Sequence, residues 1–407
     1  MRYLFIHQNF PGQFRHLAHA LASDAQHEVV GVGEARNLQA RGSPLPGVRV
    51  VGYASPVAAN DQTHAYIRPF EAHVYRGQQV AKVLEQLRSE NFVPDVVVVH
   101  PGWGEALFVA DIFPRAKVVT YLEYFYRAHG GDVGFDPEFP APPSDALRVR
   151  MQNSTQLHSL YACDAALSPT HWQKAGYPRE VQDKITVIHE GVNTQQLRPN
   201  PHAWLQLGAL RLRPGDEVVT YVARNLEPYR GFHTLMRSIA RLQALRPQAR
   251  VLIVGGDGVS YGRPVQPPMT YRKLYCAEVQ HDVDWSRVHF VGKIAYDLYV
   301  QVLQVSAVHI YLTYPFVLSW SMLEAMAAGC LLVASDTAPV REVIAHGVNG
   351  LLVDFFDAQA LAETVAQALA QPARYAPLRA QARRTACERY DLHTVCLPQQ
   401  LQFLQTL

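Results

Sequence analysis

Short apolar runs that alternate with helical segments restrict the fold of this chain more than any other feature. The run Val96–Val99 is apolar at every position, and several others are nearly so. A strand that is apolar on both faces is typical of a parallel sheet covered by helices on both sides. Six strands are predicted in the first half of the chain: Tyr3–His7, His27–Val32, Val48–Tyr53, Asp95–His100, Lys117–Leu122 and Asp164–Ser168. Five are predicted in the second half: Glu217–Val222, Arg250–Val254, Val288–Val291, Ala307–Leu312 and Cys330–Ala334.

Helical segments fit between these strands. The predicted helices are Gln13–Ala22, Glu71–Arg88, Phe232–Leu245, Tyr296–Val305, Ser321–Ala328 and Ala358–Ala370. A chain of 407 residues is long enough for two domains. The turn-rich stretch Gly191–Asp216 separates the two groups of strands. We therefore predict an α/β fold with two Rossmann-like, doubly wound parallel-sheet domains facing a central cleft, where such folds bind ligands.

Composition argues against several classes of protein. The formal net charge of +2 lacks the basic excess of a general nucleic-acid binder. The five cysteines are scattered without a CxxC pair, which argues against both a disulfide framework and a zinc site. The apolar run Tyr3–Ile6 is too short for a signal peptide, and no apolar stretch approaches the roughly 18 residues of a membrane span. We expect a cytoplasmic protein and leave open peripheral contact with the inner face of a membrane.

One long connection stands out in the first half. The segment Gly130–Pro143 contains four prolines and lies between two predicted elements. Its composition predicts a stretch without helix or strand, which is either a binding loop or a tolerated insertion.

Two arginines flank a turn after a strand of the second half. Arg224 and Arg230 stand six positions apart in the passage Tyr221–Phe232. Residues at the carboxyl end of a parallel strand border the crevice where ligands bind. Guanidinium groups match phosphate oxygens, so the pair indicates a diphosphate site. The alternative is a pair of solvated loop arginines.

The segment from Ser319 to Gly329 predicts a helix that begins near Ser319 or Ser321. Serine is a good N-cap and glycine a good terminator. The free N–H groups and positive dipole end of a helix start suit a phosphate. Glu324 is the one acidic residue of this apolar helix, which indicates burial against a partner, and its carboxylate can accept hydroxyl hydrogen bonds, as from a ribose. A capping or dipole interaction is the alternative role.

These passages resemble the retaining GT-B glycosyltransferases of family 4 (glycosyl transferases group 1). The resemblance spans the whole chain and is strongest over residues 221–354. Arg224 and Arg230 stand where that family clamps the donor diphosphate. Glu324 aligns with the second glutamate of the family's E-x7-E motif and is followed by the matching Ala-Met-Ala-Ala-Gly. The resemblance assigns Glu324 to the donor ribose.

Phe316 occupies the position of the first glutamate of that motif, as in a bacterial subgroup with the same replacement. The family uses that carboxylate to contact donor sugar hydroxyls, and a phenyl ring cannot accept their hydrogen bonds. We therefore expect the backbone of Ser319, Trp320 and Ser321 to become the main sugar contact of this domain. A core position is the alternative for the Trp320 indole.

The resemblance assigns further residues to the donor. Gly12 lies where the family has a glycine-rich turn near the donor phosphate, and His100 where it has a histidine that touches the donor sugar or its phosphate. A packed structural histidine is the alternative. Lys293 and Ile294 lie at the strand end whose backbone contacts the nucleotide base in that family. The cluster Gly255–Gly258 lacks a complete GxGxxG, which argues against a dehydrogenase.

The acceptor side is marked by the passage Tyr121–Asp132. Glu123, Arg127 and His129, together with nearby aromatic rings, form the predicted acceptor side, where the rings would stack on a sugar. The alternative is that Tyr124–Tyr126 simply pack under the proline-rich loop.

The resemblance implies a GT-B fold with an N-terminal acceptor domain at 1–195 and a C-terminal nucleotide-sugar domain at 196–389. A C-terminal helix at about 390–407 is expected to pack back on the first domain. The implied enzyme is a hexosyltransferase that moves a sugar from a nucleotide-diphosphate sugar to a saccharide, a lipid-linked glycan or a protein glycan. Retention of configuration, no metal and no other cofactor are also implied. Two alternatives are a GT-B sugar-nucleotide epimerase and a non-catalytic partner that binds a sugar nucleotide.

Overall fold

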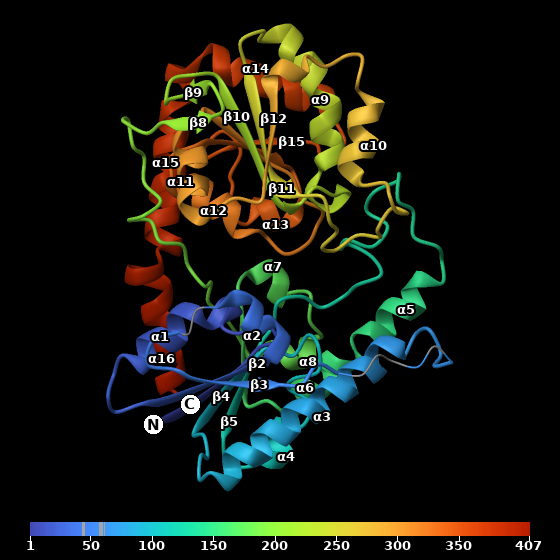
Figure 1. Cartoon of the computed structure of the whole chain (residues 1–407), viewed down its shortest axis with the longest axis vertical. Coiled ribbons are helices and arrows are strands. Elements are labelled where there is room, and N and C mark those ends of the chain that lie inside the picture. Colours follow the sequence, from blue (N-terminus) through green and yellow to red (C-terminus); the bar gives the residue numbers. More distant parts are fainter. Residues whose placement is uncertain (43–44, 57–59, 61) are drawn as a thin grey trace. The chain divides into compact units, whose positions relative to one another are not determined.

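The computed structural model describes residues 1–42, 45–56, 60 and 62–407. The chain divides into two compact units (Figure 1). The first unit consists of Met1–Glu190 together with Cys396–Leu407, and the second of Gly191–Val395.

The first unit is built on a seven-stranded sheet in the order β3-β2-β1-β4-β5-β6-β7, with every pair parallel. The strands are β1 (Arg2–Ile6), β2 (Glu28–Glu34), β3 (Arg49–Tyr53), β4 (Val96–Val99), β5 (Lys117–Tyr121), β6 (Ala165–Ser168) and β7 (Ile185–Val187). The strand order reverses direction between β1 and β4. In a doubly wound sheet this is the point where ligands bind.

Helices cover both faces of this sheet because successive strand residues point to opposite faces and both sets are apolar. Leu4 and Ile6 of β1 pack in one buried cluster with Leu84 of α3, while Tyr3 and Phe5 pack in the other with α1 and α16. The helices are α1 (Arg15–Ala22), α2 (Ala35–Arg41), α3 (Arg68–Ser89), α4 (Val109–Ile112), α5 (Asp145–Gln152), α6 (Ser154–Ala162), α7 (His171–Lys174), α8 (Arg179–Gln182) and α16 (Leu397–Gln405), with a 3-10 turn η1 (Gly12–Phe14) before α1. The last helix therefore contributes to the core of the unit that contains the first strand.

The second unit has a six-stranded parallel sheet in the order β12-β11-β10-β13-β14-β15 and a separate antiparallel hairpin, β8-β9. Its strands are β8 (Leu205–Leu207), β9 (Leu210–Leu212), β10 (Val218–Asn225), β11 (Arg250–Gly256), β12 (Val288–Gly292), β13 (Val308–Tyr311), β14 (Leu331–Ser335) and β15 (Leu351–Val353). Here the order reverses between β10 and β13, the strand that precedes the predicted phosphate-binding helix.

The helices of the second unit are α9 (Phe232–Leu245), α10 (Tyr271–Glu278), α11 (Tyr296–Gln304), α12 (Trp320–Ala327), α13 (Ala338–Arg341), α14 (Ala358–Ala370) and α15 (Pro372–Tyr390). Short turns are η2 (Pro228–Arg230), η3 (Trp285–Arg287) and the π-helical η4 (Leu392–Cys396). Helix α9 packs against α14, and α12 packs against α15 (Figure 1). The small residues Ala382 and Ala386 of α15 lie in the same buried cluster as Met322 and Met326 of α12.

The predicted α/β class with two parallel-sheet domains is confirmed, since both large sheets are parallel and covered by helices. The segment Gly130–Pro143 contains neither helix nor strand, as its prolines predict. The five cysteines are free thiols. Among the described residues, no helix has both the length and the apolar character that crossing a membrane requires.

Candidate functional site

Arg230 is a buried charged group of the second unit. It lies at the end of the turn η2 after β10 and is buried. One guanidinium nitrogen, Nη1, donates to Thr313 Oγ1 at 2.8 Å and to the carbonyl of Val317 at 3.0 Å, and its carbon lies 5.3 Å from the ring centroid of Tyr261. In the part of the chain that the structure describes, all of these partners are neutral. The alternative of a solvated loop arginine is therefore wrong for Arg230.

The hydroxyls around Arg230 support its charge. Burial alone lowers the pKa of a guanidinium, but Tyr311 and Tyr261 outweigh this effect and the pKa of Arg230 is raised. The hydroxyl of Tyr311 also accepts the backbone N–H of Ser319 at 2.7 Å. Tyr311 thus connects the buried cation with the start of α12.

Arg224 differs from Arg230 in its surroundings. It is exposed near the end of β10, and its side chain forms no hydrogen bond or ion pair with any other described residue. An exposed and unpaired guanidinium at the carboxyl edge of a sheet is available to an anionic ligand.

Glu324 lies one turn inside α12 and is held by two tyrosines of α11. Tyr296 donates its hydroxyl to Oε1 at 3.0 Å, and Tyr299 donates to Oε2 at 2.7 Å. Burial raises the pKa of Glu324, although the two tyrosine hydrogen bonds act in the opposite direction. Glu324 is half-buried against these two tyrosines, and capping is not its role, since the side chain of Ser319 provides the N-cap. Each carboxylate oxygen keeps a lone pair for a further donor.

The start of α12 agrees only in part with the expectation that the backbone N–H groups of Ser319–Ser321 are available to the sugar. Ser319 caps α12, and its own N–H is taken by Tyr311 while its hydroxyl accepts the N–H of Ser321 at 3.4 Å. Of the three backbone N–H groups at Ser319–Ser321, that of Trp320 is the one without an acceptor in the described part of the chain. The Trp320 indole is 45% exposed, so its alternative as a core residue is wrong.

Phe316, at the position of the missing glutamate, is only 7% exposed. Its ring lies 5.0 Å from that of Tyr261 and 5.6 Å from that of Tyr229. Tyr261 comes from the loop between β11 and α10, more than 50 positions away in the chain. The phenyl ring is therefore part of an aromatic cluster and does not stand alone where a carboxylate is lost.

Glu227 holds this loop and is a residue that sequence reasoning missed. It is 1% exposed, and its carboxylate accepts three consecutive backbone N–H groups: Ser260 at 2.9 Å, Tyr261 at 3.1 Å and Gly262 at 2.9 Å. An acidic residue in the same passage as the two arginines was the available signal. Three hydrogen bonds from backbone N–H groups stabilise the charge of this carboxylate without a cation.

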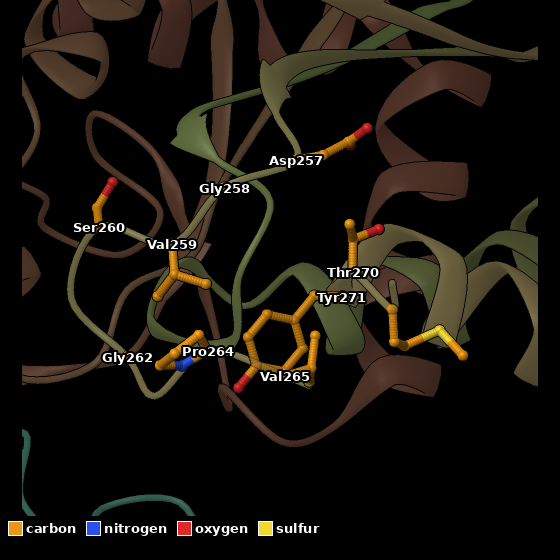
Figure 2. Close-up of a pocket in the computed structure, with 10 residues that line it drawn as sticks. Asp257, Gly258, Val259, Ser260, Gly262, Pro264, Val265, Thr270 and Tyr271 are labelled. Carbon is orange, nitrogen blue, oxygen red and sulfur yellow. The ribbon is translucent and has the colours of Figure 1, made fainter. Parts of the chain in front are cut away.

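Residues of the same loop line an open pocket of about 360 Å³. Figure 2 shows Asp257 and Thr270 at one side of this loop and Ser260 at the other. Lys293 is exposed and follows β12, and a side-chain carbon added at Gly256 would lie 2.4 Å from its Cε. Lys293 therefore crosses directly over Gly256 beside this loop, while Ile294 is half-buried in the apolar core.

In the first unit, His100 and Glu123 come together at the carboxyl ends of β4 and β5. The N–H of Gly102 donates to His100 Nδ1 at 3.1 Å, which places the ring proton on Nε2, and this nitrogen lies 3.3 Å from Glu123 Oε2. Gln13 donates to the other oxygen of Glu123 at 3.2 Å. His100 is buried and stacks on Trp103 at 4.3 Å. His100, predicted to contact the donor, and Glu123, predicted to contact the acceptor, thus belong to one hydrogen-bonded group.

Gly12 adopts a left-handed backbone conformation, with φ +48°. A side-chain carbon there would lie 2.8 Å from the ring of His7, so the close approach at this glycine is to an imidazole. His7 also lies 5.1 Å from the ring of His100. The turn after β1 and the turn after β4 therefore meet at the point where the strand order reverses.

The remaining predicted acceptor residues lie farther along the loop. Arg127 lies over Trp172 at 5.1 Å, and His129 is exposed. Tyr124 is buried and donates its hydroxyl to Asp132 at 2.7 Å. The packing alternative is therefore right for Tyr124, which holds the proline-rich loop.

Comparison with known proteins accounts for both units. Residues 25–197 match the Glycosyl transferase family 4 group, and residues 206–386 match the Glycosyl transferases group 1. The two matches together cover most of the chain, which belongs to the GT-B glycosyltransferases of family 4, group 1.

Individual relatives are more distant. The chain is 30% identical over 207 residues to D-inositol 3-phosphate glycosyltransferase of Rhodococcus jostii (strain RHA1), over 50% of this chain and 44% of that one. It is 25% identical over 307 residues to a GDP-mannose-dependent alpha-(1-6)-phosphatidylinositol monomannoside mannosyltransferase of Mycobacterium tuberculosis, over 71% and 72%. The chain thus spans about half the length of the first curated relatives that it matches.

Solved structures share the fold over the full chain. Anabaena HepE in complex with UDP-glucose has a TM-score of 0.68 at 18% identity and covers 100% of both chains. The sucrose-phosphate synthase of Thermosynechococcus elongatus has a TM-score of 0.73 at 19% identity and covers 100% of this chain and 99% of its own. At these identities the likeness establishes the GT-B fold.

Proposed function

We propose that this protein transfers a sugar from a nucleotide-diphosphate sugar to a hydroxyl group of an acceptor, with retention of configuration and without a metal. The observation that carries this proposal is Arg230. A buried guanidinium whose described partners are all neutral lies beside a helix start and the carboxylate-bearing helix α12. Desolvating a charge without an opposite charge is costly, so the arrangement is explained by an anionic ligand.

The leaving diphosphate is the anion that fits two arginines. Arg230 keeps guanidinium N–H groups beyond the two bonds of its Nη1, and Arg224 is exposed and unpaired in the described structure. Charge develops on the leaving phosphate oxygen as the glycosidic bond breaks, and preorganised donors there supply a large part of catalysis. The two arginines would stabilise this charge in place of a metal ion.

Glu324 is proposed to bind the ribose of the nucleotide. Tyr296 and Tyr299 fix the two carboxylate oxygens in position and each uses one lone pair. The remaining lone pairs can accept two neighbouring hydroxyl groups, which is the pattern that a ribose presents. Lys293 and Ile294 are proposed to contact the base through their backbone, and the N–H of Trp320 to contact the phosphate or sugar.

His100 and Gly12 of the first unit are proposed to contact the donor sugar or its phosphate, as the resemblance implies. Glu123 orients the His100 ring through Nε2. Arg127 and His129 remain the proposed acceptor residues, for a saccharide, lipid-linked or protein-linked glycan. A relative that uses GDP-mannose and a fold neighbour with bound UDP-glucose support a nucleotide sugar as donor.

The test is a donor screen with the purified chain. Binding of UDP, GDP, UDP-glucose and GDP-mannose is measured by calorimetry, and nucleotide release is measured with and without an acceptor extract. We expect binding of at least one donor and release that increases with acceptor and persists in EDTA. Absence of binding to every nucleotide would contradict the proposal.

A second candidate, a non-catalytic partner that binds a sugar nucleotide, is favoured by one observation. Phe316 replaces a glutamate that the family uses on the donor sugar, and its ring is buried among tyrosines. Donor binding without nucleotide release, in the presence of acceptor extract, would support this candidate.

A further inference from the structure

The loop that Glu227 holds brings a tyrosine to the position where the family's glutamate is missing. The three N–H groups of residues 260–262 all point to one buried carboxylate, which fixes the backbone on both sides of Tyr261. The side chain of Tyr261 then lies between Arg230 and Phe316, at 5.3 Å and 5.0 Å from its ring centroid.

The exposure of these residues shows which of them a ligand can reach. Phe316 is 7% exposed and is covered by Tyr229 and Tyr261, whereas Tyr261 itself is 37% exposed. A ligand bound at Arg230 therefore meets the tyrosine and not the phenyl ring beneath it.

We propose that the hydroxyl of Tyr261 binds a hydroxyl group of the donor sugar in place of the missing glutamate, and that Glu227 is the residue that positions Tyr261. This inference rests on the proposed function, because it takes Arg230 as the diphosphate site. A phenol hydroxyl both donates and accepts a hydrogen bond, so it can recognise a sugar hydroxyl as a carboxylate does. The loop that carries it comes from a different strand, β11, than the replaced residue, which follows β13.

The first experiment separates the sugar from the nucleotide. Tyr261→Phe keeps the ring on Phe316 and near Arg230 and removes the hydroxyl alone. We expect the affinity for the tightest nucleotide sugar of the screen to fall roughly three- to tenfold, the value of one hydrogen bond, while the affinity for the bare nucleoside diphosphate changes less than about twofold. Tyr161→Phe, at a 92% exposed tyrosine, is the matched control and should change neither affinity.

Unchanged affinity of Tyr261→Phe for the nucleotide sugar would overturn the inference. An equal loss for the sugar and for the bare diphosphate would also overturn it, since the hydroxyl would then act on the phosphate or on the fold. If the unaltered protein binds no nucleotide, the proposed function fails and this inference fails with it.

The second experiment tests whether Glu227 acts through Tyr261. Glu227→Gln loses an acceptor oxygen for the N–H groups of the loop, and we expect it to weaken binding of the nucleotide sugar about as much as Tyr261→Ala does. In the double variant, Glu227→Gln should add less than about twofold to Tyr261→Ala, because residues that act as one unit are not additive. A fully additive loss would show that Glu227 has a general structural role and would overturn its assignment as a positioning residue.

Discussion

The carboxyl ends of the two large sheets differ in how their charges are balanced. In the first unit, His100 and Gln13 both pair with Glu123, so these polar groups satisfy one another. In the second unit, Arg230 and Glu324 each have only neutral partners among the described residues. Buried charges are normally paired. Under the proposed function, the diphosphate and the ribose of the donor supply the missing partners of Arg230 and Glu324, whereas the group around His100 is already hydrogen-bonded within the first unit.

The largest effect is expected for Arg230→Ala. Loss of a charge-assisted bond to the diphosphate should raise the transition-state free energy by about 1.5–3 kcal/mol. The kcat/KM for the donor should therefore fall roughly ten- to 150-fold. Arg224→Ala should act in the same direction without any change in stability, because its guanidinium is exposed and unpaired in the described structure.

The control for the arginine variants is Arg241→Ala. Arg241 is an exposed arginine of the same unit that pairs with Glu363 at 3.0 Å, and such surface pairs contribute little. Wild-type turnover in both Arg224→Ala and Arg230→Ala, measured with the donor found in the screen, would refute the diphosphate assignment.

The next effect is expected for Glu324. Glu324→Ala should weaken binding of the bare nucleoside diphosphate roughly tenfold, because a ribose loses charged acceptors. Glu324→Gln should lose less, since an amide oxygen still accepts one hydroxyl proton. Calorimetry with the diphosphate checks both variants, and equal affinity in wild type and Glu324→Ala would show that the carboxylate does not touch the nucleotide.

The pH dependence of stability sharpens the same assignment. Burial raises the pKa of Glu324, so the folded protein favours the protonated carboxyl more than the unfolded chain does. This contribution to the free energy of unfolding is fully present below the ordinary pKa of glutamate and is lost as the pH rises through the raised pKa. Urea unfolding at a series of pH values should therefore show wild type losing stability relative to Glu324→Gln over that window. A difference that is constant with pH would contradict a desolvated carboxylate at Glu324.

The smallest effect is expected in the first unit. Glu123→Gln keeps an oxygen that can accept from His100, so turnover should fall only about two- to fivefold. Affinity for the nucleoside diphosphate should not change, in contrast to every variant of Arg230 and Glu324. Calorimetry checks this affinity. A loss of diphosphate affinity in Glu123→Gln would remove the distinction between the two sheet edges.

Elements with strong periodicity could be predicted closely from the sequence. The predicted helices at 232–245 and 358–370 coincide with α9 and α14, and the eleven predicted strands all exist, with ends shifted by a few residues. The nineteen-residue helix α15 was missed because it is largely polar and contains Pro377. It is stabilised by tertiary contacts, such as the bond from Arg383 to the carbonyl of Leu197 at 3.0 Å. The three-residue strands β7 and β15 are too short to show a period.

The features of the candidate site were likewise predicted where they depend on neighbouring residues and missed where they depend on the folded structure. Local rules indicated the N-cap Ser319, which is present, and the contact of Glu324 with a partner, which Tyr296 and Tyr299 provide, although Glu324 is half-buried and not fully buried. They did not indicate that Trp320 is exposed, or that Glu123 belongs with His100. These outcomes depend on which strands lie next to each other, and β4 and β5 are neighbours only in the folded sheet.

The sequence by itself determined the two parallel sheets, the helices that cover them and the residue types at the ends of their strands, because apolar periodicity and capping are local properties. Only the tertiary structure decided which of those charged residues have neutral partners, as Arg230 and Glu324 do, and which are paired, as His100 and Glu123 are. The loop of Tyr261 reaches Phe316 because a single buried carboxylate, Glu227, collects three backbone N–H groups from a segment more than 30 positions away. Such a contact depends on the three-dimensional path of the chain, and no pattern of neighbouring residues encodes it.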